Sequence, residues 1–497
     1  MIFKNKKIMQ NQIIIFIVVA FTLSSCEDYF DNAQLPAILV TDDWQNNDDL
    51  EKITSSAYYL WKGYNEGISD MSIVIPSFTS DEGILSAEND QNILYGNHDL
   101  LYLRETDDNS IPYLERIWQS GYEVVRMSNI GLKHLNEFGT FKTKPNSQWE
   151  DRLKGENYFC RAFAFYSLIK TFAPPYDANG DMSIPGIIIE TVNPEGAYDT
   201  KPLKTVQEAY NQILADVDSA IAYLPEAYDA DRDPEAYQDR AKRDAAHFLK
   251  ARIYFQMGPE YWEQSLAQID IVLGDGKYPL AVDPADAFEK DELGAISTET
   301  VFQYVNYAAG QQWRRPAMHR YFEASQSGRM FHMNESFAQF IGWDTNAVAM
   351  ADLRFTSLFT NLSSGIWVSK WKNSKHAVPM MRSPELHLTR AIICLLSGLG
   401  GGDSQAIADL NVVRERAYGG GYIPLDNSTT TEELIDITHR ERAIELFFEG
   451  DRLFYLQAIR GKVNPGERTD QTVLEWNSDK LYWKIPEREM NLNNNIH

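Results

Sequence analysis

Four charged side chains near the C-terminus have the types and the spacing that acid–base chemistry needs. They lie within residues 440–462 and are separated by four, four and three positions: Glu441, Glu445, Glu449 and Arg452. On a continuous helix this spacing places them along one side. A pair of carboxylates that flank a substrate is the arrangement of glycoside hydrolases. Because structural ion-pair networks have the same pattern, we favour a charge network that fixes this helix to its neighbours.

A predicted helix must position these carboxylates. Thr430 and Glu433 have the spacing of a capping box, which marks a helix start. Apolar residues then recur at helical intervals: Leu434, Ile437, Ile444 and Phe448. Three carboxylates on one side repel each other unless cations meet them. The nearby arginines are the expected suppliers of positive charge: Arg414, Arg416, Arg440 and Arg442.

The same stretch resembles a family pattern. The matching residues are Ile437, Glu441-Arg442, Glu445-Leu446, Phe448-Glu449-Gly450 and Arg452. This order is similar to the C-terminal pattern of SusD/RagB-like outer-membrane nutrient-binding lipoproteins of Bacteroidetes. Tyr455 replaces the usual Asp, and the following arginine is offset, at Arg460. Further resemblances extend over nearly all of residues 26–497, at Arg161-Ala162-Phe163, Ala408–Ala417 and Ile485-Pro486 with Glu489.

Composition excludes several classes of function. The 497 residues carry a net charge of −25, which repels nucleic acid and anionic lipid. A neutral partner such as a glycan or a peptide is expected instead. Two of the three cysteines, Cys160 and Cys394, fall within helical apolar patterns and are predicted to be buried thiols. The sequence has no zinc spacing, phosphate loop or dinucleotide fingerprint, so we expect no metal and no cofactor.

The N-terminus predicts export and anchoring. Lysines precede an apolar run at 13–23, which is too short to span a bilayer and is typical of a secretory signal peptide over residues 1–25. The run closes on Cys26 in a way that resembles a bacterial lipoprotein box. That resemblance implies cleavage before Cys26 and acylation of its thiol and amine. The polar, acidic composition of the segment that follows indicates a tether over residues 26–49. The alternative is an ordinary signal peptide that ends near a cysteine.

The fold is predicted to be mostly all-α. Helical intervals recur through the chain, and paired helices indicate TPR-like hairpins that stack into a curved slab. We expect an N-terminal helical part at 50–280 and a C-terminal SusD/RagB-like part at 281–497. The latter comprises an aromatic loop insertion at 281–380 and helices at 381–460. Together they are expected to form one compact structural unit.

Two segments without helical periodicity are expected to carry the ligand face, residues 66–110 and 281–380. Long irregular segments in helical proteins are often functional, and the family resemblance implies a ligand site in these insertions. Tryptophan rings stack on the apolar faces of sugars. The candidate ligand residues are therefore Asp81, Trp313, Trp343 and Trp367. For each tryptophan the alternative is burial in a loop core.

The resemblance implies a protein without enzymatic activity, anchored by lipid in the outer membrane and facing the cell exterior. It would capture a nutrient, with an oligosaccharide as the favoured class, and deliver it to a TonB-dependent, SusC-like outer-membrane transporter. Three alternatives stay open. The first is a peptide-binding member of the same family. The second is a lipoprotein glycosidase that uses Glu441, Glu445 or Asp81. The third is a helical-repeat scaffold that binds no small ligand.

Overall fold

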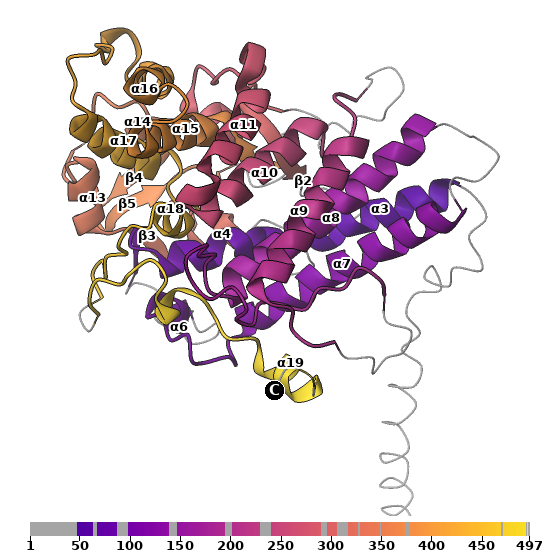
Figure 1. Ribbon diagram of the computed structural model, residues 1–497. Helices are drawn as coiled ribbons and strands as arrows, with labels where there is room; N and C mark the ends of the chain where they lie inside the picture. The colour runs from indigo at the N-terminus through magenta and orange to yellow at the C-terminus, as the bar shows by residue number, and fades with distance from the viewer. Residues whose placement is uncertain are drawn as a thin grey trace, which may run out of the picture. The chain divides into compact units, whose positions relative to one another are not determined.

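Helices form most of the fold (Figure 1). The computed structural model describes residues 47–62, 67–86, 98–138, 147–193, 201–228, 240–289, 296–305, 317–326, 329–347, 349–372, 377–468, 471–493 and 495. Residues 50–497 make one compact unit by their internal contacts. The signal peptide, Cys26 and nearly all of the tether lie outside the described residues, so those predictions stay untested.

The first half of the unit is a succession of packed helices. Their bounds are α3 Asn47–Lys62, α4 Ile68–Thr79, α6 His98–Tyr102, α7 Pro112–Phe138, α8 Ser147–Phe172, α9 Val206–Tyr223, α10 Arg243–Met257 and α11 Trp262–Leu273. From α7 to α11 each helix packs on the next one in the chain, and α7, α8 and α9 lie side by side in Figure 1. The predicted mostly helical fold built from helical hairpins is confirmed.

A second group of helices follows residue 382. These are α15 Ser383–Ser397, α16 Gly402–Tyr418, α17 Thr431–Glu445, α18 Arg452–Ala458 and α19 Glu487–Leu492. Of these, α15, α16, α17 and α18 share an apolar core with α10 and α11 that includes Leu388, Ile392, Leu410, Val413 and Leu434. Cys394 lies in this core and Cys160 lies in α8, so the prediction of two buried thiols is confirmed.

The helix starts that were predicted from capping boxes are confirmed. The Oγ1 of Thr205 accepts from the backbone N–H of Glu208, and the Glu208 carboxylate accepts in return. The same reciprocal pair joins Thr430 and Glu433 at the start of α17. Each pair satisfies backbone donors that the first turn of a helix leaves open.

The segment at 66–110 is more regular than expected. Residues Ile68–Thr79 form α4, in which all but Ser72 are buried. A helix that is buried on all sides has no polar face, so the hydrophobic periodicity that reveals surface helices is missing. Pro76 within the helix further weakens the sequence signal.

Short strands link the two segments that the sequence left irregular. β1 (Gly83–Leu85) pairs antiparallel with β3 (Phe331–Met333), so that Gly83 faces Met333. β2 (Thr300–Val305) pairs with β6 (Ala377–Arg382), and β4 (Phe359–Leu362) forms a hairpin with β5 (Gly365–Val368). Three short helices complete this region: α12 Ala317–Tyr321, α13 Glu335–Ile341 and α14 Arg354–Ser357. Residues 66–110 and 281–380 therefore share one small sheet.

No helix within the described ranges is both long and apolar enough to cross a lipid bilayer.

Candidate functional site

A tight turn between α17 and α18 positions the C-terminal carboxylates. α17 ends at Glu445, and α18 begins only at Arg452. Between them Phe448 and Gly450 have φ angles of +54° and +76°, which an α-helix does not contain. The expectation that one helix carries Glu441, Glu445, Glu449 and Arg452 is therefore wrong. A glycine inside a helical pattern is the sequence signal that marks such a break.

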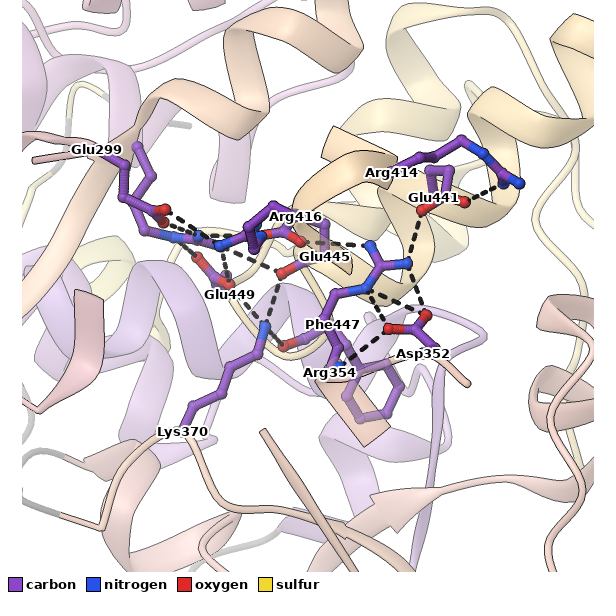
Figure 2. A network of polar contacts seen from close by, with 11 residues as sticks. Glu299, Asp352, Arg354, Lys370, Arg414, Arg416, Glu441, Glu445, Phe447 and Glu449 are labelled. Atoms are coloured by element: carbon purple, nitrogen blue, oxygen red, sulfur yellow. Dashed lines mark hydrogen bonds and ion pairs between the residues drawn. The ribbon is translucent and has the colours of Figure 1, made fainter. Parts of the chain in front are cut away.

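Glu445 lies at the centre of a buried ion network (Figure 2). Its Oε1 accepts from Nη2 of Arg416 at 2.7 Å and from Nη1 of Arg382 at 3.0 Å. Its Oε2 accepts from Nη1 of Arg354 at 3.3 Å. The Glu445 side chain has no exposed surface, so these charge-assisted hydrogen bonds replace the water that the carboxylate has lost.

Arg354 joins three carboxylates. Its Nη2 donates to Glu441 at 2.6 Å and to Asp352 at 2.7 Å, in addition to the bond from its Nη1 to Glu445. Figure 2 shows the guanidinium between these groups. The other oxygen of Glu441 accepts from Arg414 at 2.5 Å. Arg354 and Arg414 thereby relieve the repulsion between neighbouring carboxylates of α17.

Glu449 is held by a second pair of cations. Arg382 donates to Glu449 at 2.6 Å and to Glu299 at 2.7 Å. Lys370 donates to Glu449 at 2.7 Å and to the backbone carbonyl of Glu445 at 2.8 Å. These bonds tie the turn after α17 to β6 and to the segment that follows β5.

The electrostatics of Glu445 suit structure better than proton transfer. Burial alone would raise the pKa of the Glu445 carboxyl, but Arg416, Arg382 and Arg354 outweigh burial and lower it. A general acid needs the opposite, a raised pKa. Removal of one partner from a buried ion pair costs about 3–5 kcal/mol. The network can therefore lock α14, α16, α17 and β6 together.

The cations differ partly from those expected. Of the four nearby arginines, Arg414 and Arg416 contact the carboxylates of α17. The other two are directed elsewhere: Arg442 pairs with Asp451 at 2.7 Å, and Arg440 donates to the carbonyl of Asp436. Sequence reasoning missed Arg354, Lys370 and Arg382. These cations lie 63 to 91 positions from Glu445, where no local pattern links them to α17.

Asp81 forms an ion pair with Arg452, the fourth of the spaced charges. Nε of Arg452 donates to Oδ1 of Asp81 at 2.8 Å, and Nη2 donates to Oδ2 at 3.1 Å. Burial opposes ionisation of Asp81, but Arg452 outweighs it and lowers the pKa of this carboxyl. Both oxygens of Asp81 are thus occupied in this structure. Its contact with a ligand stays a prediction.

The described candidate tryptophans are packed in the interior. The Trp343 ring contacts Phe355 and Phe359 edge-on, with ring centroids 5.0 and 4.8 Å apart. Nε1 of Trp367 donates to Oγ of Ser364 at 3.1 Å, and the whole residue is buried. Trp313 lies outside the described residues. The structure therefore brings neither described candidate to the surface, and ligand contact by these three residues stays a prediction.

An open groove lies beside the strands that join the two irregular segments. It has a volume of about 870 Å³. Its polar lining includes His332, Glu335, Asn346, Thr356, Thr360, Asn361, Ser363, Ser364 and Glu467, and its apolar lining includes Ile84, Phe355 and Phe359. Sites of this size and mixed lining suit small organic ligands. Sequence reasoning looked for aromatic residues and missed these amides and hydroxyls, although asparagine and serine are frequent in the segment.

Some of these polar groups are fixed and others are accessible. The amide of Asn361 donates to the carbonyls of Thr345 at 2.8 Å and Ala347 at 3.0 Å, which shapes one wall. Asn346, Glu335 and Glu467 are at least partly exposed. Such groups can exchange hydrogen bonds with the hydroxyls of a ligand.

No group of three or more His, Cys, Asp or Glu side chains in the described part of the chain is placed to hold a metal ion.

Two family models match this chain. One, described as "Starch-binding associating with outer membrane", matches residues 88–255, and the model of the SusD family matches residues 302–497. A relative, SusD-like protein P2 of Formosa agariphila, is 24% identical over 396 residues, which are 71% of this chain and 73% of the relative.

Solved structures share the fold. A SusD superfamily protein from Bacteroides fragilis matches with a TM-score of 0.74 and 20% identity, over 91% of this chain and 99% of that one. A SusD-like carbohydrate binding protein from Bacteroides vulgatus matches at 0.68 and 18%, over 91% and 98%. Surface glycan-binding protein A from Bacteroides thetaiotaomicron, in complex with laminarihexaose, matches at 0.65 and 15%, over 91% and 98%. Because the two family models together span most of the chain and the fold agrees, this chain belongs to the SusD family.

Proposed function

We propose that this protein captures an oligosaccharide at the cell surface and passes it to a TonB-dependent outer-membrane transporter, without a catalytic step. The observation that carries the proposal is the groove of about 870 Å³ beside β3, β4 and β5. It lies where the two segments that the sequence predicted for the ligand face meet in one sheet.

The chemistry of the groove favours an uncharged sugar. Its lining, within the described residues, holds the carboxylates of Glu335 and Glu467 and no lysine or arginine. Carboxylates repel sulfated or uronic acid sugars, whereas they accept hydrogen bonds from neutral hydroxyls. Phe355 and Phe359 also border the groove but are buried against Trp343, so the accessible lining is mainly polar.

Relatives support a glycan as the ligand. The structural relative from Bacteroides thetaiotaomicron was solved with laminarihexaose, and the one from Bacteroides vulgatus is described as carbohydrate binding. The family model over residues 88–255 is described by starch binding and by association with the outer membrane. Both descriptions agree with a surface protein that receives sugar chains.

The carboxylates that could have formed a hydrolase site support a non-catalytic role. Glu441, Glu445 and Asp81 are buried, and each is held by arginine. A retaining or inverting hydrolase needs two carboxyls that reach the glycosidic bond, one of them protonated. In this arrangement the three carboxylates serve to hold segments of the chain together.

Acylation at Cys26 would place the protein on the outer membrane. Several acyl chains give stable anchoring, since each buried methylene contributes about 0.8 kcal/mol. A Cys26→Ala variant expressed in a Bacteroidetes host should lose labelling by radioactive palmitate and leave the membrane fraction. If Cys26→Ala kept both the palmitate label and its place in the membrane fraction, the lipid anchor would be refuted. The proposal that the groove binds a glycan would not be affected.

Calorimetric titration tests the capture role. The purified protein is titrated with neutral β-glucans, α-glucans, sulfated glycans and peptides, and each sample is then analysed for cleavage products. We expect saturable binding of one neutral glycan class without products. The Asn346→Ala and Glu467→Gln variants, which change accessible groove residues, should bind it at least tenfold more weakly.

A matched control separates the groove from general effects. Asn211→Ala removes an exposed amide from α9, outside the groove, and should leave the dissociation constant unchanged. If Asn346→Ala and Glu467→Gln bound the glycan with the same affinity as Asn211→Ala, the groove would be refuted as the binding site. Peptide binding alone would favour the peptide-binding alternative, and cleavage products would refute the non-catalytic role.

A further inference from the structure

Trp367 lies behind the groove and contacts two residues that line it. The indole is fully buried and is not itself part of the lining. His332 and Ser364 belong to the lining, and both are partly exposed. Trp367 is on β5, His332 is on β3, and Ser364 lies in the turn between β4 and β5. One buried side chain thus connects two parts of the groove wall.

The imidazole of His332 is held from more than one side. Its ring centroid lies 4.7 Å from that of Trp367, with an angle of 43° between the ring planes. Gly365 also lies against the ring, because a Cβ added to this glycine would be 2.7 Å from Nδ1 of His332. Nδ1 lies 3.0 Å from the carbonyl oxygen of Met333. These contacts restrict the rotation of the imidazole.

The hydrogen bond to Met333 also determines the tautomer of His332. A carbonyl oxygen can only accept, so Nδ1 of the neutral ring carries the proton and donates it. Nε2 is then the acceptor nitrogen of the ring. An imidazole that is held in one orientation presents this acceptor in one direction.

Ser364 is oriented by the other end of the same indole. Nε1 of Trp367 donates to Oγ of Ser364 at 3.1 Å. An indole N–H can only donate, so Oγ is the acceptor and the hydroxyl hydrogen of Ser364 points to another group. Ser364 directly precedes Gly365, which packs on the imidazole of His332. A hydroxyl donor and an imidazole acceptor are therefore neighbours in the groove wall.

Sugars carry groups that match this pair. Each hydroxyl of a sugar can both donate and accept a hydrogen bond. A donor beside an acceptor therefore fits two neighbouring hydroxyls of one sugar ring. Hydrogen bonds weaken steeply when their angle departs from a straight line, so the affinity depends on the orientation of both wall residues.

We propose that His332 and Ser364 bind two neighbouring hydroxyls of the glycan, and that Trp367 is a positioning residue that orients both without contact to the ligand. This inference rests on the proposed function, because it concerns the same groove. It gives Trp367 a different role from the sugar stacking that its residue type suggested. Substitutions of Trp367 should weaken glycan binding only through His332 and Ser364.

A double-mutant cycle tests the link between Trp367 and Ser364. The probe is whichever of laminarihexaose and maltohexaose the wild type binds more tightly in calorimetry. Trp367→Phe removes the N–H donor and keeps an aromatic ring, so it should weaken binding about fivefold, the effect of one hydrogen bond. Ser364→Ala should have a similar effect. The double variant should bind no more weakly than Ser364→Ala, because no hydroxyl is left to orient.

The matched control is Trp483→Phe, which changes another buried tryptophan that is not part of the groove lining. It should leave the dissociation constant unchanged. If it weakened binding as much as Trp367→Phe, or if the losses in the cycle were additive, the positioning role would be refuted while the groove remained the site. Saturable binding of neither hexaose by the wild type would contradict the proposed function, and this inference would fall with it.

Histidine spectra test the link between Trp367 and His332 without a ligand. Long-range ¹H–¹⁵N spectra show which ring nitrogen carries the proton, and the signals of His332 are those that disappear in His332→Gln. We expect the Nδ1–H form in the wild type and a mixture of tautomers in Trp367→Leu, which removes the packed ring. If Trp367→Leu does not fold, Gly365→Ala gives the same test, because its Cβ would displace the imidazole. A spectrum of His332 identical to that of the wild type would overturn the proposal.

Discussion

Asp81 and Arg452, which are 371 positions apart in the sequence, form a buried ion pair with two N–H···O bonds of 2.8 and 3.1 Å. Asp81 lies just before β1, and Arg452 is the first residue of α18. The pair therefore joins the segment predicted to form the ligand face to the C-terminal helices. Long-range ion pairs of this kind explain how strands as short as β1 and β3 are held in position.

The Asp81→Asn substitution should strongly destabilise the protein. It leaves the guanidinium of Arg452 buried without a carboxylate, and the loss of one partner from such a pair costs about 3–5 kcal/mol. Urea unfolding, followed by circular dichroism, measures the free energy of unfolding. The double variant Asp81→Asn/Arg452→Met should recover part of the loss, because no unpaired charge is then buried.

An exposed pair provides the control for this experiment. Lys462 and Glu475 are 3.1 Å apart and about two-thirds exposed, so Glu475→Gln should change the stability little. If Asp81→Asn unfolded at the same urea concentration as Glu475→Gln, the pair would not stabilise the fold. Asp81 would then be available for a role in ligand binding.

The Gly450→Ala substitution should be destabilising by at least about 2 kcal/mol, for two reasons. The φ angle of +76° is unfavourable for a residue with a Cβ atom. In addition, a Cβ at this position would lie 2.8 Å from both Cα of Ile73 and the carbonyl oxygen of Ser72, in the backbone of α4. The unfolding midpoint in urea measures the loss.

Gly274→Ala is the matched control. Gly274 has a φ of −55°, and a Cβ added there would meet no other described part of the chain within 4 Å. This substitution should leave the midpoint nearly unchanged. Equal midpoints for Gly450→Ala and Gly274→Ala would contradict both the strain expected from the φ angle of Gly450 and the expected clash with α4.

Glu82 should make the protein less stable as the pH rises. Burial raises the pKa of its carboxyl from the ordinary 4.5 to about 8, against the opposing effect of the backbone N–H of Phe448. Between these values the unfolded chain releases a proton that the folded protein retains. The free energy of unfolding should therefore fall by about 1.4 kcal/mol per pH unit from this group alone.

Glu82→Gln removes this titration, so the stability of the variant should depend less on pH between 5 and 8. Urea titrations at four pH values compare the slopes of the two proteins. Glu475→Gln serves again as a control, because an exposed carboxyl should leave the slope unchanged. A slope in Glu82→Gln equal to that of the wild type would mean that Glu82 is ionised in the folded state.

Local signals predicted the helices well because their causes are local. The capping boxes at Thr205 and Thr430 require only partners three residues away, and both formed. α4 escaped prediction because burial on every side removed the polar face that creates periodicity. The break after Glu445 coincides with Gly450 at a positive φ angle, and this glycine inside a helical pattern was a local signal that the prediction of a single helix did not use.

The residues of the candidate site were harder to predict from the sequence than the fold was. The charge pattern of α17 drew attention to Glu441 and Glu445, but the cations that hold them include Arg354, Lys370 and Arg382, which no local spacing could identify. The groove was harder still, because its lining comes from side chains of β1, β3 and the β4–β5 hairpin that only tertiary pairing brings together.

Trp343→Ala should lower stability rather than probe ligand binding directly. The ring is 6% exposed and packs on Phe355 and Phe359, and deletion of a buried aromatic ring costs about 3–5 kcal/mol. Thermal unfolding of Trp343→Ala and Trp343→Phe checks this, with a smaller loss expected for phenylalanine. Weakened glycan binding by Trp343→Ala with an unchanged unfolding midpoint would instead indicate direct ligand contact.

Glu445→Gln tests the division between structure and catalysis most directly. The amide cannot balance the charges of Arg416, Arg382 and Arg354, so the free energy of unfolding should fall by about 3–5 kcal/mol. Glycan affinity, measured by calorimetry well below the unfolding temperature, should stay within about twofold of the wild type, because Glu445 lies outside the groove lining. Neither protein should release reducing ends from the bound glycan. Hydrolysis by the wild type that disappears in Glu445→Gln, while the variant remains folded, would assign this carboxylate to catalysis and overturn the capture proposal.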